Sequence, residues 1–186
     1  PHPMKVVRSS FAPYIFTHDE MLELLSVLDS ITPSKMAYIR HLSYPVIFRI
    51  LYGCGLRVNE ALQLKITDVD LNHGVLTIKN AKFNSERIVP MSNSLIKVCR
   101  KYHDEVLSSF KTGIYFFPAK DGGYIDKGCL RAYFKKALKT CGIQETARVH
   151  DIRHTFAVHA LNKWALEDKD LNVLLPILST YMGHAT

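Results

Sequence analysis

The sequence predicts an α+β fold that is mostly α-helical, with a small antiparallel β-hairpin near residues 74–90. Apolar residues recur at helical spacing along most of the chain, which is the pattern of amphipathic helices. Alternation of apolar and polar residues is confined to two short runs on either side of a polar turn, which is the pattern of a hairpin. With 186 residues, of which 47% are hydrophobic, the chain can bury the core of one ordinary domain.

The first expected helix begins after Thr17, because Thr17 and Glu20 have the spacing of a capping box. A short break separates this helix from a second one, which ends near residues 53–55, where two glycines disfavour further helix. Arg57 therefore lies just after a tight turn, at the start of a third helix expected over residues 58–64.

The hairpin is expected to place Lys82 at or near its tip, since residues 81–85 form a polar turn between two runs of strand-forming residues. Pro90 ends the second strand because it cannot donate a ladder hydrogen bond, and a further helix is expected from Ser92 to Val106. Three more helices are expected over residues 125–141, 150–164 and 171–183.

A net charge of +7 and a pI of about 9.2 favour a polyanionic partner, either nucleic acid or a membrane surface. Apolar runs stay far below the about 20 residues that span a bilayer, and Arg49 interrupts the best of them. The four cysteines are far apart, which predicts neither a disulfide framework nor a cysteine zinc site. We therefore expect a soluble cytoplasmic protein with reduced thiols.

The helix expected over residues 125–141 has one apolar face and, on another face, a basic residue at every fourth position. These residues are Lys127, Arg131, Lys135 and Lys139. In isolation such a stripe is simply a solvated helix face. In a chain with this excess of positive charge, we interpret it as a surface for the phosphates of double-stranded DNA.

Two guanidiniums and two imidazoles are typical of a site for a doubly negative or pentacoordinate phosphate, namely those of Arg57, Arg153, His150 and His184. A guanidinium can grip two phosphoryl oxygens with its fixed fork of donors, and no paired carboxylates accompany these residues. Glu60 lies three residues after Arg57 on the same helix face and is the expected partner that orients Arg57. A purely structural ion pair is the alternative, and the two interpretations are compatible.

A metal site is the competing interpretation of His150, His154 and His159, because His-Asp-x-x-His imitates the His-Glu-x-x-His signature of zinc proteases. Two features disfavour it. Asp151 is one methylene shorter than the usual general base, and Arg153 would place a cation beside the metal. We therefore expect these histidines not to form a zinc site.

Four segments in this order resemble the catalytic domain of the tyrosine recombinases, the family of phage and transposon integrases. They are residues 55–62 with the first arginine, 81–90 with the hairpin lysine, 150–157 with His-x-x-Arg, and 181–184 with Gly-His. The departures are small, since Phe83 replaces a more usual glycine, and Tyr181 and Met182 occupy positions where leucine is common. The resemblance covers nearly the whole chain after Ala12.

This resemblance implies DNA recombination or integration by a mobile genetic element, in which a tyrosine attacks a phosphodiester and forms a 3′-phosphotyrosyl bond. Arg57, Arg153 and His184 would donate to the non-bridging oxygens. His150 would assist as donor or base, and Lys82 would protonate the leaving 5′ oxygen. The covalent intermediate conserves the bond energy, so neither metal nor ATP is needed. The implied partners are double-stranded DNA and further copies of the protein in a synaptic tetramer.

The same resemblance predicts the domain organisation. Residues 1–11 are expected to be an expression leader or linker, and residues 12–186 a catalytic domain without the N-terminal core-binding domain of the family. The family's nucleophilic tyrosine follows Gly-His, and the sequence ends at Thr186, so we expect the chain as given to lack this tyrosine and to be inactive. Tyr181 precedes Gly183 on a helix that must bury one face, so we expect Tyr181 to be partly buried and not the nucleophile.

Two alternative functions stay open. A type IB topoisomerase shares the same active-site chemistry but relaxes supercoils, and the Gly-His near the end of a short chain favours a recombinase over it. A non-catalytic DNA-binding module with a recombinase fold would keep the basic stripe without the chemistry. Association with DNA is common to all three interpretations.

Overall fold

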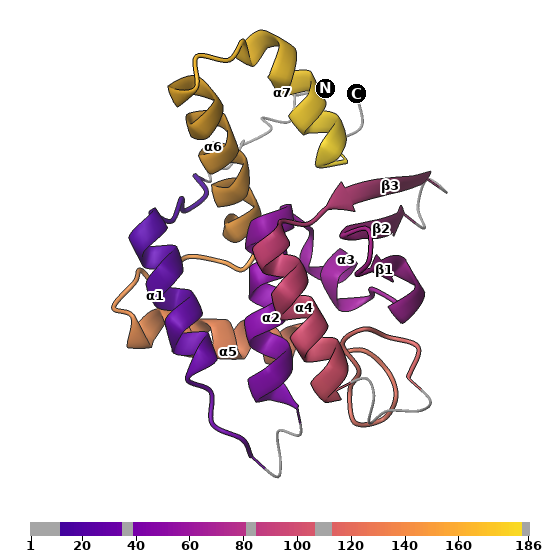
Figure 1. Ribbon diagram of the computed structural model, residues 1–186. Helices are drawn as coiled ribbons and strands as arrows, with labels where there is room; N and C mark the ends of the chain where they lie inside the picture. Colours follow the sequence, from indigo (N-terminus) through magenta and orange to yellow (C-terminus); the bar gives the residue numbers. More distant parts are fainter. Residues whose placement is uncertain (1–11, 35–38, 81–84, 107–112, 184–186) are drawn as a thin grey trace, which may run out of the picture.

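The computed structural model describes residues 12–34, 39–80, 85–106 and 113–183, and Figure 1 shows how they are arranged. Within these residues the chain forms seven α-helices, one short 3-10 helix and one three-stranded sheet. In chain order the elements are α1 (His18–Asp29), α2 (Arg40–Cys54), α3 (Val58–Leu62), η1 (Ile66–Asp68), β1 (Val69–Asp70), β2 (Val75–Asn80), β3 (Ser85–Pro90), α4 (Asn93–Val106), α5 (Lys127–Thr140), α6 (Asp151–Leu166) and α7 (Leu171–Tyr181). The predicted fold class, α+β and mostly helical, is therefore confirmed.

Helix α2 is the centre of the helical part. It is buried on most of its faces, as expected of a helix that is largely apolar all round, and it packs against α1, α4 and α6. The ring of Phe48 on α2 stacks on Phe134 of α5 with their centroids 5.6 Å apart, and Phe16 contacts the same Phe134 ring edge-on. One continuous core thus joins α2 to the surrounding helices.

The sheet is antiparallel, in the order β1, β2, β3, and lies beside α3 (Figure 1). The predicted hairpin is confirmed, because β2 pairs with β3 along both strands with Thr77 opposite Ile88. Leu76 and Val89 are partners across the two strands, and both are fully buried. The sequence does not predict β1, because this strand has only two residues, which are too few to show the alternation of apolar and polar residues typical of a strand. Lys82, at the predicted tip, lies outside the described residues.

Several helix ends lie one or two residues from their predicted positions, including the end of α7 at Tyr181 and the end of α6 at Leu166, and two of these shifts have a clear local cause. Helix α3 ends at Leu62, two residues before its predicted end, because the chain leaves the helix to pair with a later segment. Leu64 accepts a backbone hydrogen bond from the Phe116 N–H at 2.8 Å. Helix α5 begins after Asp126 and not at residue 125, because the Asp126 carboxylate caps the helix by accepting a backbone N–H at 2.9 Å.

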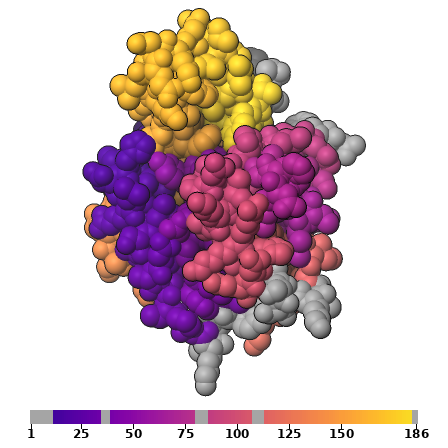
Figure 2. Space-filling view, in the orientation of Figure 1, coloured from indigo at the N-terminus to yellow at the C-terminus, as the bar shows by residue number. Residues whose placement is uncertain are grey.

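Helices α6 and α7 form an arm that rises from the rest of the molecule, and this arm is the upper lobe in Figures 1 and 2. The first turn of α6 is buried at Asp151, Ile152 and Arg153, whereas the far end of α6 is exposed. Helix α7 returns toward the α2–α3 turn, where Tyr181 contacts Cys54. The arm therefore brings the C-terminal end of α7 to the start of α3. None of the described helices is both long and apolar enough to cross a membrane.

Candidate active site

The turn between α2 and α3 places Arg57 at the start of a helix. Gly55 ends α2 in the left-handed region, at a φ of 61°, and a Cβ there would lie 2.3 Å from the Phe156 ring, so only glycine fits. Arg57 directly precedes α3, and the Glu60 carboxylate accepts the Arg57 backbone N–H at 2.8 Å. The carboxylate therefore stabilises the helix start and lies beside the Arg57 side chain.

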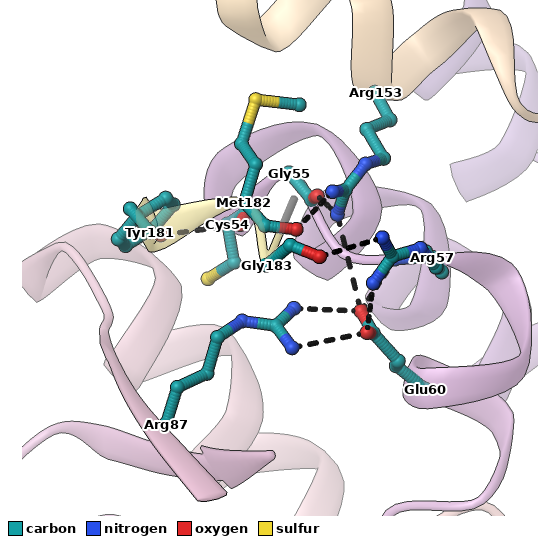
Figure 3. Close-up of polar contacts among 9 residues, drawn as sticks. All are labelled: Cys54, Gly55, Arg57, Glu60, Arg87, Arg153, Tyr181, Met182 and Gly183. Atoms are coloured by element: carbon teal, nitrogen blue, oxygen red, sulfur yellow. Dashed lines mark hydrogen bonds and ion pairs between the residues drawn. The ribbon is translucent and has the colours of Figure 1, made fainter. Parts of the chain in front are cut away.

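Three guanidiniums from separate elements surround the Glu60 carboxylate (Figure 3). Arg57 Nη1 lies 2.9 Å from Oε1, and Arg87 of β3 binds both oxygens, with distances of 3.0 and 2.8 Å. Arg153 of α6 has its Nη1 3.9 Å from Oε2 and a side chain that is only 3% exposed. The four side chains together carry an excess of two positive charges. Such a cluster, largely removed from water, favours an incoming anion.

The last turn of α7 and the residues after it cover two of these guanidiniums (Figure 3). Arg57 Nη2 donates to the backbone carbonyl of Gly183 at 2.9 Å. Arg153 donates to the carbonyl of Met182 and, through Nη1, to the carbonyl of Gly55 at 2.6 Å. Each guanidinium is thus fixed by backbone carbonyls as well as by Glu60, so its remaining N–H groups have defined directions.

Burial and the neighbouring side chains shift the pKa values of Arg153 and Glu60 in this cluster. Burial lowers the pKa of Arg153 to about 10, and the neighbouring Arg57 acts in the same direction. Burial alone would raise the pKa of Glu60, but hydrogen bonds from Arg87 and Arg57 outweigh it, so the Glu60 pKa lies below its usual value. Arg153 and Glu60 are therefore both charged at neutral pH.

A cavity of about 450 Å³ lies between α3, α5 and the residues that precede α6. Six basic residues contribute to its lining, together with Val58, Asn59, Phe134 and Val149. The basic ones are Arg57, Lys127, Arg131, Lys135, Arg148 and His150. Three of the four residues of the predicted stripe thus share a cavity with Arg57, whereas Lys139 does not line it. His184 lies outside the described residues, as Lys82 does.

The histidines of α6 are distributed differently from a zinc site. His150, directly before α6, has a pKa that is lowered chiefly by burial and further by His154. The rings of these two residues meet edge-on with centroids 5.1 Å apart. His159 instead stacks against His18 at 3.9 Å and has its Nδ1 2.8 Å from the hydroxyl of Tyr52. In the part of the chain that the structure describes, no group of three or more His, Cys, Asp or Glu could hold a metal ion.

Comparison with known proteins identifies the family. A family model described as the phage integrase family matches residues 15–176. The chain belongs to the phage integrase family. A Sinorhizobium fredii protein that carries the name integrase/recombinase is 34% identical over 181 residues, which are 92% of this chain and 58% of that protein. The chain thus spans little more than half the length of this relative.

Solved structures of tyrosine recombinases share the fold of this integrase-family domain. The crystal structure of XerA recombinase has a TM-score of 0.77 and 27% sequence identity, covering 96% of this chain and 57% of XerA. The XerH recombinase in a pre-cleavage complex with its difH substrate has a TM-score of 0.76 at 24% identity, covering 94% of this chain and 48% of XerH. The chain is therefore a tyrosine recombinase catalytic domain in fold.

Sequence reasoning misses two arginines of this integrase-family domain. Arg87 binds Glu60. The sequence does contain a feature that points to Arg87, because it lies on the same strand face as Val89, two residues further along, which is fully buried. Arg148 lines the cavity and pairs with the buried Asp151, with Nη2 2.9 Å from Oδ1. The sequence feature that points to Arg148 is its i, i+3 spacing to Asp151 at the start of a helix.

Proposed function

We propose that this integrase-family domain binds double-stranded DNA and supplies the phosphate-activating side chains of a metal-independent strand transfer. The observation that carries the proposal is the cluster in which Arg57, Arg87 and Arg153 surround the single carboxylate of Glu60. The excess positive charge of this cluster suits a phosphodiester, which gains charge on its non-bridging oxygens as it becomes pentacoordinate. The guanidiniums are fixed before the substrate arrives, which is what transition-state stabilisation requires.

The proposed reaction forms one phosphorus–oxygen bond and breaks another. A tyrosine hydroxyl attacks the scissile phosphodiester, the 3′ side stays on the enzyme as a phosphotyrosyl ester, and the 5′ oxygen leaves as a hydroxyl after protonation. Arg57, Arg153 and His184 donate to the non-bridging oxygens. His150 assists as donor or base, and Lys82 protonates the 5′ oxygen. Each preorganised donor contributes roughly 3 kcal/mol to the transition state.

The cavity beside Arg57 supplies the proposed path for the DNA backbone. Lys127 and Arg131 project from α5 into the same cavity as His150, so neighbouring phosphates of one strand can be neutralised on either side of the reacting one. XerH, which shares the fold, is bound to its difH substrate in the solved complex, and this supports DNA as the partner proposed here. Exchange of strands between two DNA sites further requires several copies of the protein, which we propose to form a synaptic tetramer.

The domain organisation is part of the same proposal. Residues 12–186 would form the catalytic domain, preceded by a leader or linker over residues 1–11. In the cell we expect this domain to act in the cytoplasm, on DNA.

The DNA-binding part is tested by fluorescence anisotropy with a labelled duplex at several salt concentrations. We expect the affinity to fall steeply as salt rises, with little sequence preference. Lys127→Ala and Arg131→Ala should each reduce the slope of log K against log salt by about 0.9. Lys139→Ala is the matched control on the same helix and should change the slope less, because Lys139 does not line the cavity. Affinity that is independent of salt, or equal losses for Lys139→Ala, would contradict the assigned path.

A further inference from the structure

We propose that Arg87 is a positioning residue of the strand-transfer site, which holds Glu60 so that the Glu60 carboxylate fixes the guanidinium of Arg57. This inference rests on the proposed function, because its consequence is a rate of phosphodiester cleavage. Arg87 comes from β3, whereas Arg57 and Glu60 come from the start of α3. The sheet would thereby control the geometry of a site that is built mainly on helices.

The hydrogen bonds around Glu60 are the first support. Oε1 accepts from Arg57 Nη1 at 2.9 Å and from Arg87 Nη1 at 3.0 Å. Oε2 accepts from the Arg57 backbone N–H and from Arg87 Nη2, each at 2.8 Å. Both oxygens are therefore shared between the same two arginines (Figure 3). Arg57 contacts each oxygen once, and the planar fork of Arg87 adds a second bond to each, so Arg87 further restricts rotation of the carboxylate about its last bond.

The immobility of Arg87 itself is the second support. Its neighbour Val89 is fully buried, β3 is paired with β2 along its length, and the Arg87 side chain is only 17% exposed. The buried Nε of Arg87 has no hydrogen-bond partner within the described residues. Within the described residues, the two bonds to Glu60 are therefore the hydrogen bonds that orient this guanidinium.

The contact with Gly183 is the third support. A Cβ built on Gly183 would lie 3.3 Å from Arg87 Nη1 and 3.5 Å from Arg57 Nη1, so the backbone at Gly183 rests directly on both guanidiniums. Both Nη groups of Arg87 are bound to Glu60, and its Nε is buried. It therefore acts through Glu60 and Arg57 and not by touching the substrate.

The test compares Arg87→Met with a matched control elsewhere in the fold. Arg49 also binds a carboxylate with both Nη groups, since its distances to the Asp29 oxygens are 2.7 and 2.6 Å, but this pair lies outside the site. Single-turnover cleavage of a nicked half-site is measured for the full-length protein, alongside the Kd for the same DNA. We expect Arg87→Met to cleave about 10- to 100-fold more slowly with a nearly unchanged Kd. Arg49→Met should keep the wild-type rate.

The pH profile separates positioning from a general loss of structure. Since the hydrogen bond from Arg87 lowers the Glu60 pKa, its removal raises that pKa, and the acid limb of the cleavage profile should move to higher pH. Arg49→Met should leave the acid limb of the profile in place. Arg87→Lys should cleave faster than Arg87→Met, because lysine restores part of the interaction with Glu60. If Arg87→Met cleaves at the wild-type rate, or loses rate and DNA affinity in parallel, the positioning role is wrong.

A second measurement decides the inference without any cleavage. The carboxyl carbon of Glu60 is titrated by NMR in the wild-type chain and in the same two variants. A Glu60 pKa that rises in Arg87→Met and not in Arg49→Met supports the positioning role, whereas an unchanged value overturns it. If the wild-type protein cleaves no DNA, the proposed strand transfer fails, and this titration still shows whether Arg87 holds Glu60.

Discussion

The hydroxyl of Tyr181 donates a hydrogen bond to the backbone carbonyl of Cys54, with the two oxygens 3.1 Å apart. The Tyr181 ring also stacks on Phe156, with centroids 5.8 Å apart. This contact ties the end of α7 to the end of α2, next to the carbonyl of Gly55 that binds Arg153. The expectation that Tyr181 is partly buried is confirmed. Burial also raises the pKa of Tyr181, which keeps its hydroxyl protonated.

Tyr181→Phe should weaken the fold slightly and leave covalent chemistry intact. Removing one hydrogen bond to a carbonyl is expected to lower the free energy of unfolding by about 1 kcal/mol, as measured by urea denaturation. Because the hydroxyl is committed to Cys54, any covalent DNA adduct of the protein should persist in this variant. An adduct that disappears in Tyr181→Phe, on a denaturing gel, would identify Tyr181 as the nucleophile and contradict our assignment.

Gly183→Ala should disturb the arginine cluster more than its backbone strain alone explains. Gly183 has a φ of 67°, and the added Cβ would crowd the guanidinium nitrogens of Arg87 and Arg57. Gly142→Ala is the matched control, because Gly142 has a φ of 65° but, apart from its chain neighbours, no atom of the described residues within 4 Å of the added Cβ. Both variants should lose about 1 kcal/mol of stability in urea, and only Gly183→Ala should also slow DNA cleavage. Equal cleavage by the two variants would show that the crowding has no effect.

His150 should be neutral at pH 7, because burial and nearby cations lower its pKa. Its ring can then accept a proton or a hydrogen bond during the reaction. NMR titration of the imidazole should give a pKa below that of a free histidine, and His154→Gln should raise it, since His154 contributes to the shift. A His150 pKa at or above the free value would remove the physical basis for a role as base.

Acid should destabilise the contact between α1 and α6. Burial lowers the pKa of His159, and His18 lowers it further, so the folded state binds protons less readily than the unfolded one. The resulting stability is fully present above the unfolded pKa of about 6.5 and is lost as the pH falls through the folded value. The thermal midpoint should therefore drop between pH 7.5 and 5, and less so in His159→Gln. An identical drop in both proteins would show that other groups cause it.

Local patterns in the sequence predict much of the fold and part of the site. The Thr17–Glu20 capping box is confirmed, since the Thr17 hydroxyl accepts the Glu20 N–H at 3.1 Å and Glu20 accepts the Thr17 N–H at 2.7 Å. The pairing of Arg57 with Glu60 is confirmed as well. Both depend on residues three apart, whose proximity follows directly from helical geometry.

The remaining features of the site depend on contacts between distant segments, which no local pattern specifies. Arg87 reaches Glu60 only because the β3 strand lies beside α3. In the sequence, the contact is indicated only by the position of Arg87 on a strand face that is buried. The carbonyls of Met182 and Gly183 bind Arg153 and Arg57 because the arm folds back. Backbone carbonyls have no sequence signature at all, so these partners emerge only from the three-dimensional fold.

Single-turnover cleavage of a nicked half-site tests most directly whether the guanidiniums of Arg57 and Arg153 activate a phosphodiester. The full-length wild-type protein is compared with its Arg57→Lys and Arg153→Lys variants, with thermal melting to confirm that each variant folds. An ammonium keeps the charge but cannot reproduce the planar fork, so each variant should cleave about 100- to 1,000-fold more slowly at a DNA affinity within a few-fold of wild type. Cleavage by either folded variant at a rate near that of the wild type would contradict the proposed site.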